Sequence, residues 1–424
     1  MKKKITSIAM AFFMIGTLLG CTGDPLCAER GDILTSDGKV LARSGASGDG
    51  FERIYPEKSL ACQLVGSCYA EQGSSGIEYQ FRDELENMSE ISLTINSRLQ
   101  HMAETLLDGR SGTVVVVNPQ TGGVLALAST PACDLNDPDE EGLVNRAVEL
   151  CIPGSIFKTI TLAAALEEGE LTLDSVYDAP ASLVLPEGAV VNYNTMQYNA
   201  LTVREAYVQS CNTVFAQISL QLGLDDIDEM AGKFGFDQMI SQDIDCPIST
   251  IQNKDVMTGL ARAWCGVGQA LLVSDDCLVG PVTTALHMAS IASYFANDGV
   301  LYAPYTIEAI KTVEGNVKKT QPQALGSGII EEGHRAQIAD VMRLAVLQGT
   351  AKNAAVSGID VGGKTGTAET QYGYDDGWFC GFAKTDSASV AVVVLLENAT
   401  SSDASRVASS VIAGSLGEMG GLSD

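Results

Sequence analysis

The hydrophobic pattern from residue 113 onward predicts strands at both ends of the domain and helices between them. Residues 113–117 and 124–128 are apolar, and the stretch between them holds a proline and two glycines, so the pair is predicted to form a hairpin. Apolar residues recur at helical spacing over residues 201–222, 227–234, 283–296 and 333–349. Strand patterning returns over residues 362–370, 378–383 and 389–396, and a last helix is predicted over 403–416.

This order of elements predicts an α+β fold. We expect the early hairpin and the three late strands to form one five-stranded, mostly antiparallel sheet sandwiched by helices. The central helices are expected to form an all-helical lobe to one side. The stretch 389–396 (SVAVVVLL) is a nearly continuous apolar run, which is typical of a strand covered on both faces.

The preceding segment, residues 22–108, is turn-rich and mixed in composition. A hairpin is predicted to turn at Asp37-Gly38, followed by a short strand over residues 93–95 and a helix over residues 97–107. We therefore predict a small β-rich N-terminal pedestal module, packed beside a larger domain that spans residues 109–424.

The first 21 residues are predicted to be a targeting segment. Three lysines at positions 2–4 precede an apolar stretch over residues 5–20, which ends in Leu-Leu-Gly before Cys21. This resembles a bacterial lipoprotein signal with Cys21 as the lipidated residue, and an uncleaved membrane anchor is the alternative. Both interpretations place the chain at the cell membrane, with the remaining residues on the extracytoplasmic side. We expect no second segment that crosses the membrane.

Composition narrows the possible partners. The 424-residue chain has a formal net charge of −27, which disfavours binding to the phosphate backbone of nucleic acids. Among its eleven cysteines, Cys62 and Cys68 are close in sequence within a plausible loop, whereas Cys211 and Cys380 lie in apolar stretches where cysteine is usually a small buried hydrophobe. With three histidines and no Cys-x-x-Cys pair, we expect no metal site.

A candidate nucleophile lies at Ser155, three residues before Lys158. On a helix that begins near Ser155, this spacing puts both side chains on one face, where the amine can take the proton of the hydroxyl. The same Ser-x-x-Lys spacing occurs at Ser36 and Lys39, but Asp37-Gly38 makes that segment a turn.

Two further motifs carry candidate chemistry. Ser210 and Asn212 fall within the predicted helix 201–222 and offer a hydroxyl and an amide, although a polar pair on a solvated helix face would look the same. Lys364, on a predicted strand, offers a cation for a carboxylate. Gly366 allows close approach of a substrate backbone, and the Thr367 N–H can point into a cleft.

The second lysine motif also fits a phosphate-binding loop. Residues 358–365 satisfy Gly-x-x-x-x-Gly-Lys-Thr, but that loop requires a buried strand before it and a helix after it. Residues 352–357 (KNAAVS) are no strong strand, and β-type sequence follows. We therefore set the nucleotide-binding interpretation aside.

Ser-x-x-Lys, Ser-x-Asn and Lys-Thr-Gly, in this order, resemble the three signatures of penicillin-recognising serine enzymes. The chain is similar to class B penicillin-binding proteins in particular. The similarity extends over five further stretches, namely Arg30-Gly31-Asp32-Ile33, Arg53-Ile54-Tyr55-Pro56, Gly76-Ile77-Glu78, Asn145-Arg146-Ala147 and Trp378-Phe379-Cys380-Gly381-Phe382. Cys211 departs from the pattern, because an aspartate often stands in the middle of the second signature.

The resemblance implies D,D-transpeptidation of peptidoglycan stem peptides without a cofactor, and trapping by β-lactams. Ser155 would be the nucleophile and Lys158 its base, with the N–H groups of Ser155 and Thr367 binding the oxyanion. Further roles are implied for the remaining residues: proton relay by Ser210, orientation by Asn212, and carboxylate binding by Lys364, Thr365 and Thr367 beside Gly366.

Three alternatives stay open at this point. A D,D-carboxypeptidase or a β-lactamase would use the same signatures, and a non-catalytic membrane-tethered scaffold or β-lactam sensor would keep the fold. The roughly ninety residues before the catalytic domain are too few for a glycan-polymerising domain. The resemblance therefore implies a polytopic membrane glycosyltransferase as partner.

Overall fold

The computed structural model describes residues 28–48, 50–69, 73–169, 171–274, 277–369 and 373–419. The predicted targeting segment, Cys21 included, lies outside these residues. Among the helices in the described ranges, none has both the length and the apolar character needed to cross a bilayer.

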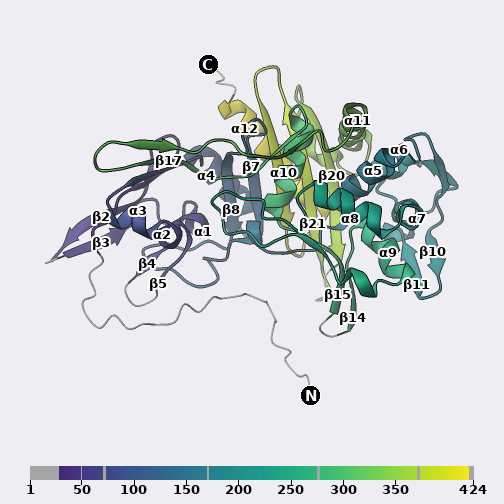
Figure 1. Ribbon diagram of the computed structural model, residues 1–424, viewed down its shortest axis with the longest axis horizontal. Helices are drawn as coiled ribbons and strands as arrows, with labels where there is room; N and C mark the ends of the chain where they lie inside the picture. Colours follow the sequence, from purple (N-terminus) through teal and green to yellow (C-terminus); the bar gives the residue numbers. More distant parts are fainter. Residues whose placement is uncertain are drawn as a thin grey trace.

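The predicted five-stranded sheet forms the centre of the molecule (Figure 1). Its spatial order is β20-β21-β22-β7-β8, and every neighbouring pair is antiparallel. The strands are β7 (Gly112–Val117), β8 (Val124–Thr130), β20 (Asp360–Glu369), β21 (Asp375–Lys384) and β22 (Ser389–Leu396). The apolar run of β22 lies in the middle of the sheet and is buried after its first residue, which confirms the prediction made from its sequence.

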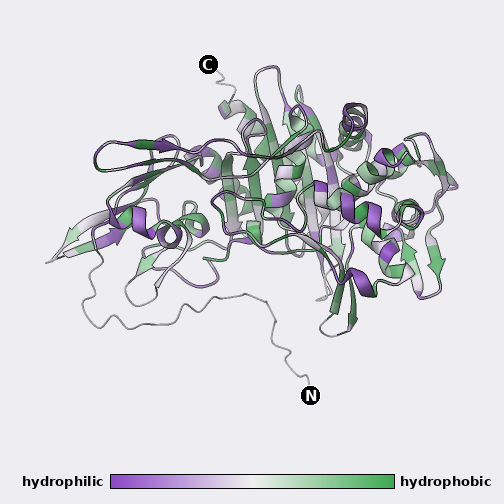
Figure 2. Cartoon of the chain, viewed as in Figure 1, coloured by the Kyte–Doolittle hydropathy of each residue, from purple (hydrophilic) through white to green (hydrophobic). Residues whose placement is uncertain are grey.

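Helices cover both faces of this sheet, and alternate residues of a strand enter different cores. Val115 packs in the core that contains α10 (Ala285–Ala296). Its neighbour Val114 packs in the core that contains α4 (Ser97–Leu107) and α12 (Ser401–Met419). This follows from the two-residue period of a strand, and Figure 2 shows the hydrophobic residues gathered on the central strands.

The lobe beside the sheet is built on helices but also contains short strands. Its helices are α5 (Lys158–Glu167), α6 (Val203–Val208), α7 (Asn212–Leu222), α8 (Leu224–Lys233) and α9 (Gly259–Val267), with α11 (Glu332–Gln348) next to β20. The strands pair as β9 (Val176–Asp178) with β12 (Ala200–Thr202), β10 (Ser182–Leu185) with β11 (Gly188–Val191), and β15 (Cys277–Val282) with β13 (Thr250–Gln252) and β14 (Leu271–Ser274). The expectation of an all-helical lobe needs this correction, because most of these strands are too short to show an alternating pattern.

The predicted helix over residues 201–222 is two helices, α6 and α7, with a break between them. Thr202 starts α6 with a reciprocal cap, in which its hydroxyl accepts from the Glu205 N–H and the Glu205 carboxylate accepts from the Thr202 N–H. The chain leaves the helix at Ser210, whose φ is 56°, and α7 begins at Asn212. Ser210 therefore lies in a turn and not inside a helix, which corrects the sequence-based placement.

The N-terminal sheet combines early and late segments of the chain in the order β18-β17-β6-β1-β2-β3. Its strands are β1 (Ile33–Leu34), β2 (Val40–Ser47), β3 (Gly50–Ile54), β6 (Glu90–Leu93), β17 (Ile307–Lys311) and β18 (Val317–Lys319). β1 and β2 confirm the hairpin that turns at Asp37-Gly38. The late strand β17 lies beside this early region in Figure 1 and completes its sheet.

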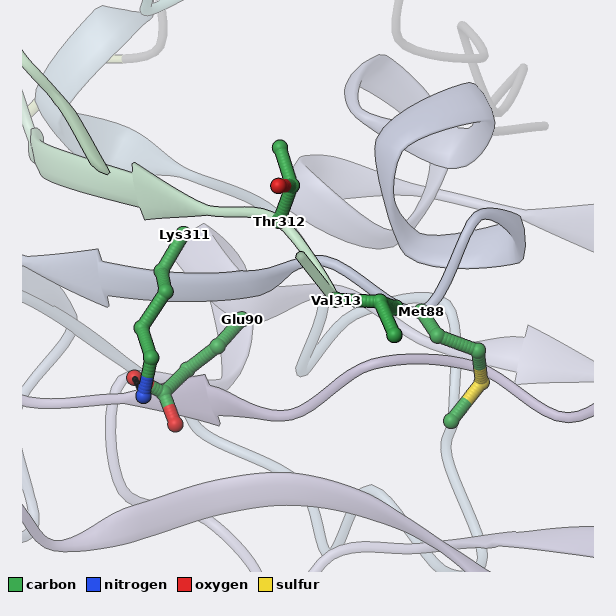
Figure 3. Close-up of a pocket in the computed structure, with 5 residues that line it drawn as sticks. All are labelled: Met88, Glu90, Lys311, Thr312 and Val313. Carbon is green, nitrogen blue, oxygen red and sulfur yellow. Dashed lines mark ion pairs between the residues drawn. The ribbon is translucent and has the colours of Figure 1, made fainter. Parts of the chain in front are cut away.

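The N-terminal sheet carries a pocket where the end of β17 meets the start of β6. Lys311 pairs with Glu90 across the two strands at 3.7 Å, and Met88, Thr312 and Val313 complete the lining (Figure 3). None of these five residues belongs to the candidate chemistry identified from the sequence.

Three of the stretches that resemble class B proteins meet in this module. Arg30, Arg53 and Glu78 come from different segments, and both arginines bond to the carboxylate of Glu78. The Arg53 Nε is 2.6 Å from Glu78 Oε1, and the Arg30 Nη1 is 3.1 Å from Oε2. The short elements nearby are α1 (Cys62–Val65), β4 (Cys68–Tyr69), β5 (Gly73–Ser74), α2 (Gly76–Gln80) and α3 (Arg82–Glu86), while β16 (Val300–Tyr302) pairs with β19 (Ala324–Ser327) elsewhere.

Candidate active site

The Ser155 motif lies where a 3-10 turn, Gly154–Phe157, continues directly into α5. Ser155 is partly exposed, while the Lys158 side chain is fully buried at the start of the helix. The Lys158 Nζ lies 3.0 Å from Ser155 Oγ, so the spacing read from the sequence does place both groups on one face.

Three other contacts surround the amine of Lys158. Its Nζ is 2.9 Å from the backbone carbonyl of Ser210, 2.7 Å from Asn212 Oδ1 and 3.4 Å from Ser210 Oγ. The nitrogen of the Asn212 side-chain amide fixes the orientation of this amide, because Nδ2 donates to the Val191 carbonyl at 2.8 Å. Oδ1 is therefore the atom that faces the lysine.

This geometry can hold Lys158 in its neutral form. The Ser210 carbonyl and Asn212 Oδ1 can only accept hydrogen bonds, so they take up the two N–H groups of an uncharged amine. The remaining lone pair then faces the hydroxyl of Ser155. Burial lowers the pKa of Lys158 to about 7, although interaction with Cys211 opposes this.

The turn that carries Ser210 is fixed by the helices on either side. The N–H groups of Asn212 and Thr213, at the start of α7, both donate to Asn192 Oδ1, at 2.8 and 3.1 Å. Asn192 therefore acts as a remote N-cap, and the sequence analysis missed it because it lies about 20 residues upstream in a loop. Cys211 is buried beside it, as its apolar surroundings predicted.

Lys364 projects from β20 into the same cluster. Its Nζ donates to Ser210 Oγ at 2.8 Å and to the Thr365 carbonyl at 2.9 Å, and its side chain is fully buried. Burial, and then the charge of Lys158, lower the pKa of Lys364 well below its ordinary value. Ser210 Oγ thus stands between two amines, and three contacts of at most 3.4 Å join Lys364 to Ser155.

Close backbone packing holds β20 against the Ser155 turn. A Cβ on Gly154, whose φ is 58°, would stand 2.6 Å from the Thr367 carbonyl, and one on Gly366 would stand 2.9 Å from the Pro153 carbonyl. Gln269 completes the junction, because its Nε2 donates to the same Thr367 carbonyl at 3.0 Å. The sequence analysis missed Gln269, which follows α9 and belongs to none of the three motifs.

The two threonines of the third motif have different partners. The Thr365 hydroxyl is buried and contacts the Thr350 hydroxyl at 2.6 Å, whereas the Thr367 hydroxyl donates to Ser401 Oγ at 3.5 Å at the start of α12. The structure thus brings Ser155, Lys158, Ser210, Asn212 and Lys364 into one network, with Thr365, Gly366 and Thr367 along its edge.

The competing motifs lie elsewhere or lack the expected context. Ser36 and Lys39 flank a turn of the N-terminal sheet, where Lys39 pairs with Glu57 at 3.1 Å. Residues 358–365 lead into a long strand and not a helix, so they do not form a phosphate-binding loop. Within the described ranges, no group of histidine, cysteine or carboxylate side chains is arranged to hold a metal ion.

Comparison with known proteins agrees with this geometry. Residues 112–416 match the family described as the penicillin binding protein transpeptidase domain, and residues 30–111 match the penicillin binding protein A dimerisation domain. The chain is 28% identical over 434 residues to the peptidoglycan D,D-transpeptidase PbpA of Mycolicibacterium smegmatis, covering 88% of this chain and 85% of that protein.

Solved structures show the same fold. The D,D-transpeptidase domain of a peptidoglycan glycosyltransferase from Eggerthella lenta has a TM-score of 0.87 and 34% identity, covering 93% of this chain and all of that one. The imipenem acyl-enzyme complex of penicillin-binding protein A from M. tuberculosis has a TM-score of 0.82 and 27% identity, covering 92% and 99%. Fold and site together define a penicillin-recognising serine enzyme. The chain belongs to the penicillin-binding protein transpeptidase family, as a class B member.

Proposed function

We propose that this protein is a peptidoglycan D,D-transpeptidase that forms an acyl-enzyme on Ser155 and is trapped there by β-lactams. The observation that carries the proposal is the environment of Lys158. Its Nζ lies 3.0 Å from Ser155 Oγ and within hydrogen-bond distance of two pure acceptors, so an uncharged amine that donates to those acceptors would turn its lone pair toward the Ser155 hydroxyl. A base of this kind makes a serine a competent nucleophile.

Acylation begins with the attack of Ser155 Oγ on the carbonyl between two terminal D-alanines, while its proton passes to Lys158. The N–H groups of Ser155 and Thr367 bind the developing oxyanion, and each such donor is typically worth about 3 kcal/mol. The tight packing of Gly154 against the Thr367 carbonyl supports this role, because it fixes the two segments relative to each other.

Ser210 passes the proton on to the leaving D-alanine. Its hydroxyl lies 3.4 Å from Lys158 Nζ and 2.8 Å from Lys364 Nζ, so it can receive a proton on one side while the cation of Lys364 polarises it on the other. The amine of a second stem peptide then attacks the ester carbonyl, which forms the cross-link and releases Ser155.

Lys364 binds the terminal carboxylate of the donor peptide, together with the hydroxyls of Thr365 and Thr367. In the free site its charge is disfavoured by burial and by Lys158. A bound carboxylate supplies the missing counter-charge and raises the pKa of Lys364 again. Binding of the substrate therefore keeps the positive charge on Lys364 and leaves Lys158 as the neutral base.

The competing activities within the superfamily are less well supported. Of the related structures, penicillin-binding protein A from M. tuberculosis is described as a penicillin G acyl-enzyme complex, at 26% identity and a TM-score of 0.81. A β-lactamase must hydrolyse that ester rapidly. The PbpA proteins of Mycolicibacterium smegmatis and Mycobacterium tuberculosis, each 28% identical to this chain, are named peptidoglycan D,D-transpeptidases, which favours transpeptidation over carboxypeptidation and over a scaffold or sensor role.

We further propose that the protein is held at the bacterial cell membrane by its N-terminal segment, with the catalytic domain on the extracytoplasmic side. The basic, apolar start of the chain and Cys21 support a lipoprotein or an uncleaved anchor. The N-terminal module of residues 22–108 then stands as a pedestal beside the catalytic domain of residues 109–424, and a polytopic membrane glycosyltransferase supplies the glycan strands.

Intact-mass measurement after incubation with benzylpenicillin tests the function. We expect a stable adduct of one penicillin per chain, and a Ser155→Ala variant that forms none, because loss of such a nucleophile costs roughly 10⁶-fold. Ser36→Ala is the matched control and should be acylated like the parent protein. An adduct on the Ser155→Ala variant, or its decay within seconds on the parent, would refute the proposal.

A further inference from the structure

Two cysteines that are far apart in the sequence lie together where the N-terminal module meets the catalytic domain. Cys62 is the first residue of α1, and Cys133 follows the end of β8. The backbone of Gly142 lies against both. Its carbonyl accepts from Cys62 Sγ at 3.5 Å, and a Cβ on Gly142 would stand 2.4 Å from the Cβ of Cys133.

The two thiols also contact each other, and both are buried. Cys62 is fully buried and Cys133 is 4% exposed. A hydrogen bond between their side chains raises the pKa of Cys62, with burial adding to the effect. The same bond lowers the pKa of Cys133. Cys133 also keeps a small exposed fraction while Cys62 has none, so Cys133 is the thiol of the pair that an oxidant reaches first, as the thiolate that is reactive in disulfide exchange.

We propose that Cys62 and Cys133 form a disulfide that joins the N-terminal module to the catalytic domain. The proposal depends on the extracytoplasmic location proposed above, since disulfides form and persist outside the reducing cytoplasm. Sequence spacing pointed instead to Cys62 and Cys68, which are neighbours along the chain. The fold brings the more distant Cys133 against Cys62.

The chemistry is a two-step thiol–disulfide exchange with a disulfide oxidant of the cell envelope. The Cys133 thiolate attacks one sulfur of the oxidant, which forms a mixed disulfide and releases the first thiolate. Cys62 loses its proton and attacks the Cys133 sulfur, which closes the protein disulfide and releases the second thiolate. Two protein thiols are oxidised, one oxidant disulfide is reduced to two thiols, and the two protons go to the released thiolates.

The bond would reinforce a junction at which the Gln63 side chain already makes three hydrogen bonds. Gln63, next to Cys62, donates through Nε2 to the carbonyls of Ser129, Pro131 and Gly142, at 3.1, 3.1 and 2.8 Å. All three acceptors lie at the end of β8 or in the loop that follows it. Because that loop continues toward the Ser155 turn, the cross-link fixes the module against the part of the catalytic domain that leads to the nucleophile.

Peptide mapping after refolding tests the proposal independently of export. The full chain is reduced, denatured, refolded with detergent in a glutathione redox buffer, alkylated and digested with trypsin. Cys62 lies in the peptide 59–82 and Cys133 in the peptide 111–146. We expect mass spectrometry to find these two peptides linked, with fragmentation that places the bond at Cys62, and reductant to lower the melting temperature by about 5 °C.

Cys68→Ser is the matched control, because Cys68 shares a tryptic peptide with Cys62. The linked species should persist in Cys68→Ser and be lost in Cys62→Ser. Recovery of both cysteines in alkylated form from folded parent protein, or a link through Cys68, would overturn the proposal. Fluorescent-penicillin labelling of the same samples reads out Ser155 separately, so a failure there would count against the proposed function alone.

Discussion

Two regions of this molecule bury charged side chains, and they do so in opposite ways. In the N-terminal module, the carboxylate of Glu78 is fully buried between Arg30 and Arg53, with contacts of 3.1 and 2.6 Å. In the candidate active site, Lys158 and Lys364 are just as deeply buried. Among the described residues, neither lysine has a carboxylate within ion-pair distance.

The difference separates charges that hold the fold from charges that carry out chemistry. Burial of a charged side chain destabilises the fold unless a partner of opposite charge lies beside it. A buried group without such a partner shifts its pKa so that its neutral form is favoured. Glu78 has two such partners and ties three segments of the module together. The lysines have none, so burial makes Lys158 a base at neutral pH and leaves Lys364 in need of an anion.

The largest expected effect that distinguishes the two regions is that of Lys158→Met. Loss of a positioned general base typically lowers the rate by about 10²- to 10⁴-fold, so we expect acylation by benzylpenicillin to fall by that factor. Stability should respond in the other direction or not at all. The lowering of the Lys158 pKa from 10.5 to about 7 costs about 4 kcal/mol of folding free energy at pH 7, and this offsets the bonds that methionine cannot make.

The measurement pairs stopped-flow acylation with thermal unfolding at pH 7. A melting temperature well below that of the parent protein would show that the Lys158 contacts stabilise the fold, and the contrast between the two regions would fail at that point.

The second effect is on stability alone and is expected for Glu78→Gln. The variant leaves Arg53 buried without a counter-charge and leaves Arg30 with only the partly exposed Glu86, and removal of one partner of a buried pair costs about 3–5 kcal/mol. Acylation of the folded fraction should be unchanged. Denaturant unfolding and penicillin labelling on the same sample measure both quantities.

Glu86→Gln is the matched control, because Glu86 also pairs with Arg30, at 2.9 Å, but its side chain is 43% exposed. It should cost less than 1 kcal/mol, as is typical of solvent-exposed pairs. Equal losses in the two variants would mean that burial of Glu78 does not decide its contribution.

A site residue could be predicted from the sequence where local spacing determines its position, and could not where contacts between distant segments do. Ser155 and Lys158 are three residues apart, and helical spacing made their contact predictable. Ser210 was placed in a helix because apolar residues recur at helical spacing over residues 201–222, and its φ of 56° reveals the turn. Asn192 and Gln269 support the site from loops, and no periodic pattern marks such residues.

The same distinction between local pattern and distant contacts applies to the fold. The bounds of β22 were predicted correctly, because both of its faces are buried and its sequence is apolar after Ser389, whereas β21 begins three residues before the predicted strand. The addition of β17 to the N-terminal sheet was not foreseen, since the pairing of β17 with β6 joins segments about 215 residues apart and depends on tertiary packing. For the same reason the contact between Cys62 and Cys133 could not be read from their spacing.

The smallest expected effect is on the pH dependence of acylation, which measures directly that Lys158 is buried without a counter-charge. Below pH 7, protonation removes the Lys158 lone pair, so the acylation rate should fall about tenfold per pH unit and level off above pH 7. Asn212→Asp tests the cause. In the parent protein, Asn212 Oδ1 is 2.7 Å from Lys158 Nζ. A carboxylate in place of this amide favours the charged amine, so the pH at which the acylation rate levels off should rise by about 1–2 units. An unchanged profile in this variant would show that a group other than Lys158 controls the rate.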